Sequence, residues 1–220
     1  MAKKIGLYSL TKKCGKTIST AFLAESFATL GTNVLVLDLN SDKNFEVLLG
    51  FEHPENLKSD IKTVKISQSS WKYLKINENT ANLDSEFENF DQEYDYIFVD
   101  FPSYDSSFNS DILKKLNSII IPVECEYYGI DELDKTIEKI IEIENLKIEG
   151  ILLTKFNKDN QLMPKFIEFI RENFEGMVLE TIIARNYYLG LPKFTIENLN
   201  HFIPNIGYAD YLKLANELKK

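Results

Sequence analysis

The sequence predicts an α/β fold, in which a doubly wound, mainly parallel sheet carries helices on both faces. Short runs rich in β-branched residues alternate with segments of helical periodicity, as in repeated β-α-β units. The run Ser118–Val123 is apolar almost throughout, which is typical of a central parallel strand that is covered on both faces. We therefore expect a single domain over residues 1–220.

The periodicity places the elements in order along the chain. The expected strands are Lys4–Ser9, Asn33–Asp38, Tyr73–Ile76, Tyr96–Asp100, Ser118–Val123, Ile148–Thr154 and Val178–Ile183. The expected helices, each with an apolar face, are Thr17–Leu30, Ile130–Glu144 and Met163–Phe174. Gly31 is expected to end the first helix. Residues 52–93 are polar and poorly periodic, so we expect there a variable surface excursion that holds one strand.

Composition and charge exclude several classes of function. The net charge of −9 means that any nucleic-acid binding must come from a local basic patch. The two cysteines, Cys14 and Cys125, and the two histidines, His53 and His201, have no metal-ligand spacing, which excludes a zinc or disulfide framework. No apolar run approaches the ~20 residues that a membrane span needs. We expect a cytoplasmic protein that does not bind membranes.

An altered phosphate-binding loop follows the first expected strand. Residues 11–17 read Thr-Lys-Lys-Cys-Gly-Lys-Thr and open the first expected helix. Gly15 lets the backbone approach a phosphate, Lys16 supplies a cation, and Thr17 supplies a hydroxyl ligand for Mg²⁺. The sequence therefore predicts a site for ATP or ADP with Mg²⁺. The residues expected around the nucleotide are Lys12, Lys13, Cys14, Gly15, Lys16, Thr17 and Thr20.

Two expected strands close on aspartates, Asp38 and Asp100. A carboxylate at the carboxyl end of a central strand, beside a phosphate loop, is placed to hold Mg²⁺ or its water shell. Taken alone, Asp100 is better interpreted as a strand-terminal turn residue, but the neighbouring loop favours a metal role. We expect Asp100 and Thr17 to be the metal-site residues.

These segments resemble the ParA/MinD group of deviant-Walker P-loop ATPases, and most of all the short, Soj-type partition proteins. The resemblance extends beyond the loop. It includes Ile121–Ile130, Ile148–Thr154, Glu180–Asn186 and Tyr208–Ala215, and it covers nearly everything except residues 52–93.

The resemblance implies an ATP-binding protein that forms a nucleotide-sandwich homodimer and associates with nonspecific DNA or another surface. Hydrolysis stimulated by a ParB-like or other protein partner would release it, in plasmid or chromosome partition or in cargo positioning. Lys16 matches the family's phosphate-binding lysine, Thr17 its Mg²⁺ hydroxyl, and Asp100 its strand-end carboxylate. Asp38 and Asn40 stand at the two positions of the family's catalytic Asp-x-Asp pair.

Four departures from the family pattern concern catalysis. The family's signature lysine, which reaches the partner's phosphates, falls at Thr11, and two loop glycines fall at Lys12 and Lys13. Lysine at a glycine position that needs left-handed angles costs ~1–2 kcal/mol per residue. The second acid of the pair falls at Asn40, whose amide hydrogen-bonds water but accepts no proton. We expect weak or absent ATP hydrolysis.

Alternatives remain open. The chain is either a ParA-type ATPase or a non-catalytic pseudo-ATPase scaffold that binds a protein partner. Lys12 and Lys13 either retain an anion or are solvated lysines of a disused loop. A MinD-like membrane regulator is disfavoured, because the apolar stripe of Leu214, Ala215 and Leu218 is too short for a membrane anchor. That terminal segment is expected to pack against the sheet.

The sequence gives less support for contacts to DNA and to adenine than for the phosphate and Mg²⁺ sites. A basic patch would draw on Arg185, Lys193, Lys213, Lys219 and Lys220, but the acidic balance favours a solvated surface. Asn157 is a candidate for the adenine edge, with a locally bonded loop asparagine as the alternative. The chain opens directly on its first strand, so no helix-turn-helix domain for operator binding is expected.

Overall fold

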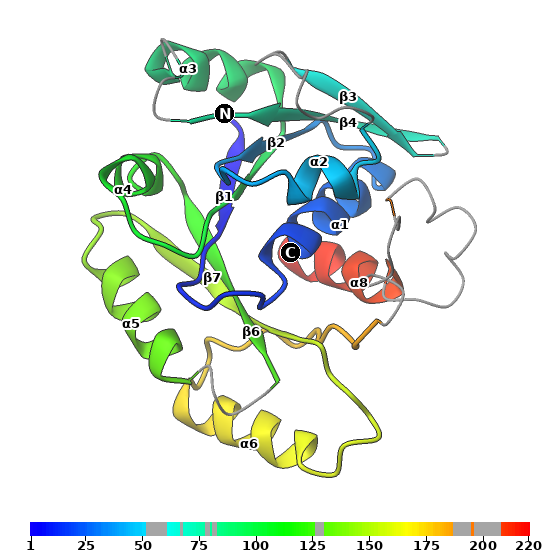
Figure 1. Cartoon of the computed structure of the whole chain (residues 1–220), viewed down its shortest axis with the longest axis vertical. Helices are drawn as coiled ribbons and strands as arrows, with labels where there is room; N and C mark the ends of the chain where they lie inside the picture. Colours follow the sequence, from blue (N-terminus) through cyan, green and yellow to red (C-terminus); the bar gives the residue numbers. More distant parts are fainter. Residues whose placement is uncertain are drawn as a thin grey trace.

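The computed structural model describes residues 1–51, 61–66, 68–77, 80, 83–125, 130–186, 195 and 208–220. The strands are β1 (Lys3–Leu7), β2 (Val34–Asp38), β3 (Lys62–Ile66), β4 (Ser69–Lys75), β5 (Tyr96–Asp100), β6 (Ser118–Glu124) and β7 (Lys147–Thr154). The helices are α1 (Lys16–Thr29), α2 (Asn44–Leu48), α3 (Leu83–Glu93), α4 (Ser107–Leu113), α5 (Ile130–Ile141), α6 (Met163–Asn173) and α8 (Tyr208–Leu218) (Figure 1).

The strands form one sheet in the order β3-β4-β2-β5-β1-β6-β7. Only the β3–β4 pair is antiparallel, and the other neighbours run parallel. From β1 the chain crosses through α1 to β2 on one side, whereas from β5 it crosses through α4 to β6 on the other. The strand order therefore reverses between β1 and β5, and sheets of this kind bind ligands at the carboxyl ends of the strands beside such a reversal.

Helices cover both faces of the sheet, which confirms the predicted fold class (Figure 1). Helices α1, α2 and α8 pack on one face, and α3 to α6 pack on the other. Phe27 of α1 lies on β5, with ring centroids 4.4 Å from Tyr96 and 5.2 Å from Phe98. Strands buried on both sides explain the continuous apolar runs in the sequence.

The predicted helices begin and end within three residues of those observed, and Gly31 adopts φ +81° directly after α1. The terminal helix α8 packs chiefly on α1 rather than directly on the sheet. The Tyr211 ring lies 5.1 Å from that of Phe22, and its hydroxyl is 2.9 Å from Ser19 Oγ. No helix in the described part of the chain has the length and apolar character needed to cross a membrane.

The strand predicted over Val178–Ile183 is wrong. The chain there makes only isolated bridges, Ile151 with Val178 and Phe156 with Ala184. Leu179 N donates to Ile151 O, and Ile183 N donates to Leu153 O. Between these two bonds the chain advances four residues here but only two along β7. The two extra residues interrupt the pairing with β7, so a regular ladder does not form.

Within residues 52–93, the predicted strand Tyr73–Ile76 is present as β4 (Ser69–Lys75), but the expectation of a surface excursion with only one strand is wrong. The described part of that range holds β3, β4 and α3, and β4 pairs with β2 inside the main sheet. Trp71 and Tyr73 of β4 are buried, and Trp71 Nε1 donates to Glu25 Oε2 of α1 at 3.1 Å. The sequence signal was the alternation of Trp71 and Tyr73 with polar residues, which is typical of a strand with one buried face.

Candidate nucleotide-binding site

The phosphate-binding loop connects β1 to α1 at the reversal point of the sheet. Gly15 stands directly before α1 with φ +97°, a left-handed angle that favours glycine. A Cβ atom there would meet only ordinary contacts, so the backbone angle, and not crowding, requires glycine. Lys13 also adopts a left-handed angle, with φ +60°. Lys12 does not have a positive φ, so one of the two expected strained positions is confirmed.

The Lys16 side chain is folded back onto its own loop. Its ammonium donates to Ser9 O at 3.0 Å, Thr11 O at 3.0 Å and Ser103 Oγ at 2.6 Å, and the residue is 7% exposed. An ammonium carries three protons, so these neutral acceptors occupy all of them. A phosphate oxygen would have to replace at least one of these acceptors.

Thr17 and Asp100 face each other at the start of α1 and the end of β5. Thr17 Oγ1 donates to Asp100 Oδ2 at 2.7 Å, and Thr20 Oγ1 lies 3.5 Å from Asp100 Oδ1. Burial, followed by the charge of Asp38, raises the pKa of Asp100 well above its usual range. A hydroxyl and a carboxylate beside a phosphate loop fit a Mg²⁺ ion that is held mostly by phosphate oxygens and water. The predicted pair is therefore brought together.

Asn40 joins the two strand-end carboxylates. Its Nδ2 donates to Asp38 Oδ1 and to Asp100 Oδ2, both at 2.8 Å, and its backbone N–H donates to Asp38 Oδ1 at 2.9 Å. Burial raises the pKa of Asp38 to about 6, although the bonds from Asn40 oppose that rise. The amide thus supplies two protons between carboxylates that would otherwise repel each other.

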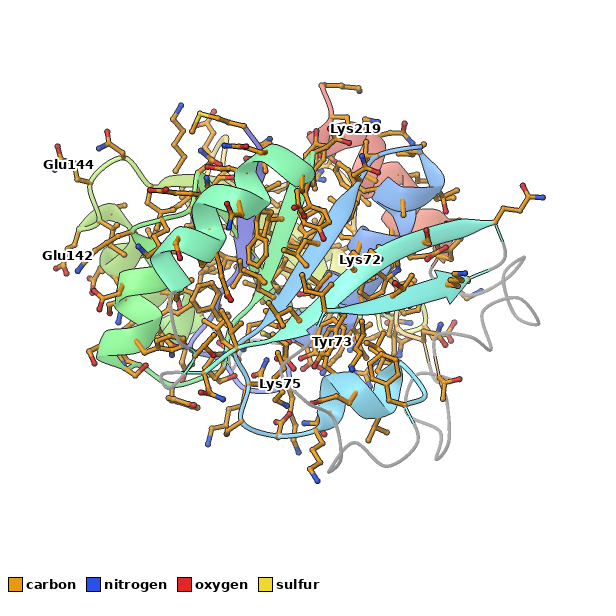
Figure 2. All side chains as sticks on the ribbon, turned by 90° about the horizontal axis from the view of Figure 1, so that it is seen from above. Lys72, Tyr73, Lys75, Glu142, Glu144 and Lys219 are labelled. Carbon is orange, nitrogen blue, oxygen red and sulfur yellow. The ribbon has the colours of Figure 1, made fainter. Side chains whose placement is uncertain are left out.

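Asp38 is also bound from the side of β4. Tyr73 Oη donates to Asp38 Oδ2 at 2.9 Å, and Lys75 Nζ lies 3.7 Å from the same oxygen. Lys75 also contacts Glu46 Oε1 of α2 at 2.7 Å and donates to Asp42 O. Figure 2 labels Tyr73 and Lys75, which both belong to β4. Sequence reasoning missed Tyr73 and Lys75 as site residues, because it placed them in a surface excursion. The sequence signal that could have revealed them is the lysine, Lys75, near the end of a predicted strand, because two other strands end on the aspartates Asp38 and Asp100.

A cavity of about 1080 Å³ opens in front of these residues. The loop side contributes Lys12, Lys13, Gly15, Lys16 and Thr17, and the facing walls come from the segments around Asn40, Ser103 and Arg185. Among the predicted residues, Cys14, Thr20, Asp38 and Asp100 lie behind this lining, all of them buried.

The structure does not bring Asn157 to this cavity. Its Oδ1 accepts a hydrogen bond from Asp159 N at 3.1 Å, in a local turn. In the candidate basic patch, Arg185 is paired with Glu124 at 3.1 Å and Lys213 lies 3.9 Å from Asp210. Lys193 and residues 126–129 of the Ile121–Ile130 segment lie outside the described residues. Two of the five cations of the candidate patch thus have acidic neighbours, which weaken their electrostatic attraction to DNA phosphates.

Comparisons with known proteins agree with this geometry. A family model described as an AAA domain matches residues 57–151, a range that does not include the loop. The chromosome partitioning protein ParA of Myxococcus xanthus is 29% identical, over 94% of this chain and 84% of its own length. The sporulation initiation inhibitor Soj of Bacillus subtilis is 26% identical, over 99% of this chain and 98% of its own.

Solved structures show the same fold. A chain of the MinC:MinD cell division protein complex of Aquifex aeolicus gives a TM-score of 0.77 at 18% identity, and the match covers 99% of this chain and 96% of that one. MinD of Pyrococcus horikoshii, solved with Mg-ADP, gives 0.74 at 18% identity, over 100% and 97%. These likenesses show that the fold is that of a P-loop nucleoside triphosphatase. Within that class, the fold is of the ParA/MinD type.

Proposed function

We propose that this chain is a ParA-like protein that binds adenine nucleotide with Mg²⁺ and hydrolyses ATP slowly or not at all. The observation that carries the proposal is the pairing of Thr17 with Asp100 at the start of α1, beside Lys16 and a cavity large enough for a nucleotide. Phosphate oxygens would meet the N–H groups of the loop and the first turn of α1. Lys16 would then exchange its acceptors for phosphate oxygens.

The expected weakness of hydrolysis rests on Asn40. A general base must accept a proton from the attacking water, and an amide does not do so. The two shortest donor contacts of Asn40 Nδ2, both at 2.8 Å, go to carboxylates, and a longer one at 3.4 Å goes to Asp100 O, so the group is oriented toward Asp38 and Asp100. When bound, Mg²⁺ would neutralise phosphate charge. Thr17 and Asp100 would hold it or its water shell.

The proposed biological role is partition of a plasmid or chromosome, or positioning of another cargo. It is supported by the relatives named ParA and Soj, which this chain resembles over most of its length. A nucleotide-dependent homodimer and a ParB-like partner belong to the same proposal. Nonspecific DNA binding is its weakest part, because the net charge is −9 and two of the candidate cations have acidic neighbours.

A second function has one observation in its favour. All three protons of the Lys16 ammonium already have protein acceptors, so this cation is satisfied without a ligand. This favours a pseudo-ATPase scaffold that keeps the fold and binds a protein partner without nucleotide.

Titration with the Mg²⁺ complex of a fluorescent ATP analogue, with molecular mass measured in parallel, separates the two functions. The proposal predicts about micromolar binding. It also predicts that Lys16→Ala loses this binding, that mass shifts to the dimer, and that Lys165→Ala on the exposed face of α6 changes neither. Absence of binding and an unchanged mass would support the scaffold.

A further inference from the structure

Lys12 and Lys13 stand out among the cations that line the cavity. Both are exposed, and within the described residues neither has a hydrogen bond or ion pair. The other cations are engaged. Lys16 is bound to neutral oxygens, and Lys155 and Arg185 both contact Glu124, at 2.6 Å and 3.1 Å.

The residues expected to hold Mg²⁺ in the same site are already occupied by hydrogen bonds within the protein. Asp100 Oδ2 already accepts from Thr17 and from Asn40 Nδ2. The amide hydrogens of Asn40 put partial positive charge beside the position where a cation or its water shell would sit. Asp38 is likewise occupied, by Asn40 and Tyr73.

We infer that Lys12 and Lys13 supply, within one chain, much of the charge neutralisation that Mg²⁺ otherwise provides, so that this site retains a nucleoside triphosphate without the metal. The inference rests on the proposed function, because it concerns the same site. The ligand class is the triphosphate group of a nucleotide, and metal dependence is what the two lysines change. The left-handed φ of Lys13 fits this role, since a strained backbone is retained where it positions a side chain for function.

The two lysines also offer mobile charge in place of a fixed ion. Their exposed side chains have room to follow the phosphate oxygens across the cavity mouth. An ammonium that moves from water to a phosphate makes a charge-assisted hydrogen bond. Each such contact typically contributes up to about tenfold in affinity at a partly exposed site.

The test is a titration of the full chain with a fluorescent ATP analogue, with Mg²⁺ and then with EDTA in its place. The double variant Lys12→Gln and Lys13→Gln removes both charges and keeps side-chain length. The matched control, Lys65→Gln with Lys165→Gln, removes the same charge from two exposed lysines that do not line the cavity.

For the wild type and the control, we expect EDTA to weaken binding by less than about tenfold. In the Lys12→Gln and Lys13→Gln variant, EDTA should weaken it by more than about a hundredfold, because about tenfold is lost with each lysine. An equal effect of EDTA on all three proteins would overturn the inference, as would loss of wild-type binding in EDTA. If the wild type binds the analogue with Mg²⁺ but not in EDTA, the inference fails and the proposed function stands. If the wild type binds it neither with Mg²⁺ nor in EDTA, the inference and the proposed function both fail.

Discussion

The side-chain amide of Asn40 donates to Asp100 Oδ2 at 2.8 Å and so connects the end of β2 to the buried end of β5. The same nitrogen donates to Asp38, so it lies between two carboxylates that are both fully buried. Asn40 therefore has a structural consequence as well as a catalytic one. With an amide in place of an acid at position 40, there is one negative charge fewer beside Asp38 and Asp100.

Asn40→Asp should destabilise the metal-free protein. The substitution puts a third carboxylate against Asp38 and Asp100. Repulsion among the three carboxylates then raises their pKa values in the folded protein further. Destabilisation should therefore be small at about pH 4.5, grow as pH rises through about 6, and reach about 1–3 kcal/mol near pH 7.5. Denaturant unfolding at the two pH values measures it.

Mg²⁺ should recover part of that loss, because a cation offsets the added charge. Asn44→Asp is the matched control, since Asn44 also donates to an aspartate, Asp42, but is exposed. Its effect should stay within about 0.5 kcal/mol. An Asn40→Asp variant as stable as the wild type at neutral pH would mean that the amide does not relieve repulsion.

Lys13→Gly should stabilise the protein. Lys13 has φ +60°, an angle that costs a side-chain-bearing residue about 1 kcal/mol and costs glycine nothing. Lys12 lacks a positive φ, so Lys12→Gly should be neutral or destabilising through added freedom of the unfolded chain. Urea midpoints of the two single variants compare them directly. Equal shifts would contradict the assignment of strain to Lys13 alone.

Lys75→Met should loosen the wall of the cavity formed by α2. The substitution leaves Glu46 and Asp38 without their cation, although Glu46 is 2% exposed and Asp38 is fully buried. Removing one partner of such a cluster costs about 2–4 kcal/mol. Thermal unfolding at neutral pH should show this loss for Lys75→Met and almost none for Lys72→Met, whose ammonium contacts only Thr63 among the described residues.

Much of the fold could be predicted from the sequence, because buried parallel strands leave continuous apolar runs and α1 has a clear end at Gly31. The strand at Tyr73–Ile76 was predicted, but its full extent as β4 and its place in the main sheet were not, because polar flanks hid that Trp71 and Tyr73 reach a core made by distant α1. The strand predicted over Val178–Ile183 failed for another reason. Its apolar residues are buried against β7, but a bulge prevents continuous pairing, and composition does not reveal a bulge.

The candidate site shows the same limit. Local spacing was sufficient to place Lys16 and Thr17 together, since the loop leads directly into the helix. Asp100 lies 83 residues from Thr17, and it was placed there by the rule that the carboxyl ends of parallel strands meet at one edge of the sheet and by the family resemblance. The contacts of Lys75 with Asp38 and Glu46 depend on the pairing of β4 with β2, which is a long-range property. The amide bridge made by Asn40 likewise depends on β2 lying beside β5.

Glu25 should give the protein a separate pH dependence. It is buried in α1, where Ser69, Trp71 and Thr29 donate to it, and burial raises its pKa to about 6 from 4.5. A raised folded-state pKa contributes stability that is complete below about 4.5 and is lost as pH rises through about 6, in total about 2 kcal/mol.

The difference in unfolding free energy between wild type and Glu25→Gln, measured from about pH 4 to about pH 7, isolates this residue from Asp38 and Asp100. It should fall by about 2 kcal/mol across that range. Glu168→Gln, on the exposed face of α6, should show a flat difference. A flat difference for Glu25→Gln as well would mean that the pKa of Glu25 in the folded protein is not raised above its value in the unfolded chain.

A single-turnover experiment tests the central claim most directly. Protein in excess is mixed with labelled ATP and Mg²⁺, and bound ATP and ADP are quantified over time. The same is done for the variant that combines Thr11→Lys, Lys12→Gly, Lys13→Gly and Asn40→Asp. We expect the wild type to hold ATP largely unhydrolysed and the variant to convert it about a hundredfold faster or more. Rapid conversion by the wild type, or a variant no faster than the wild type, would contradict it.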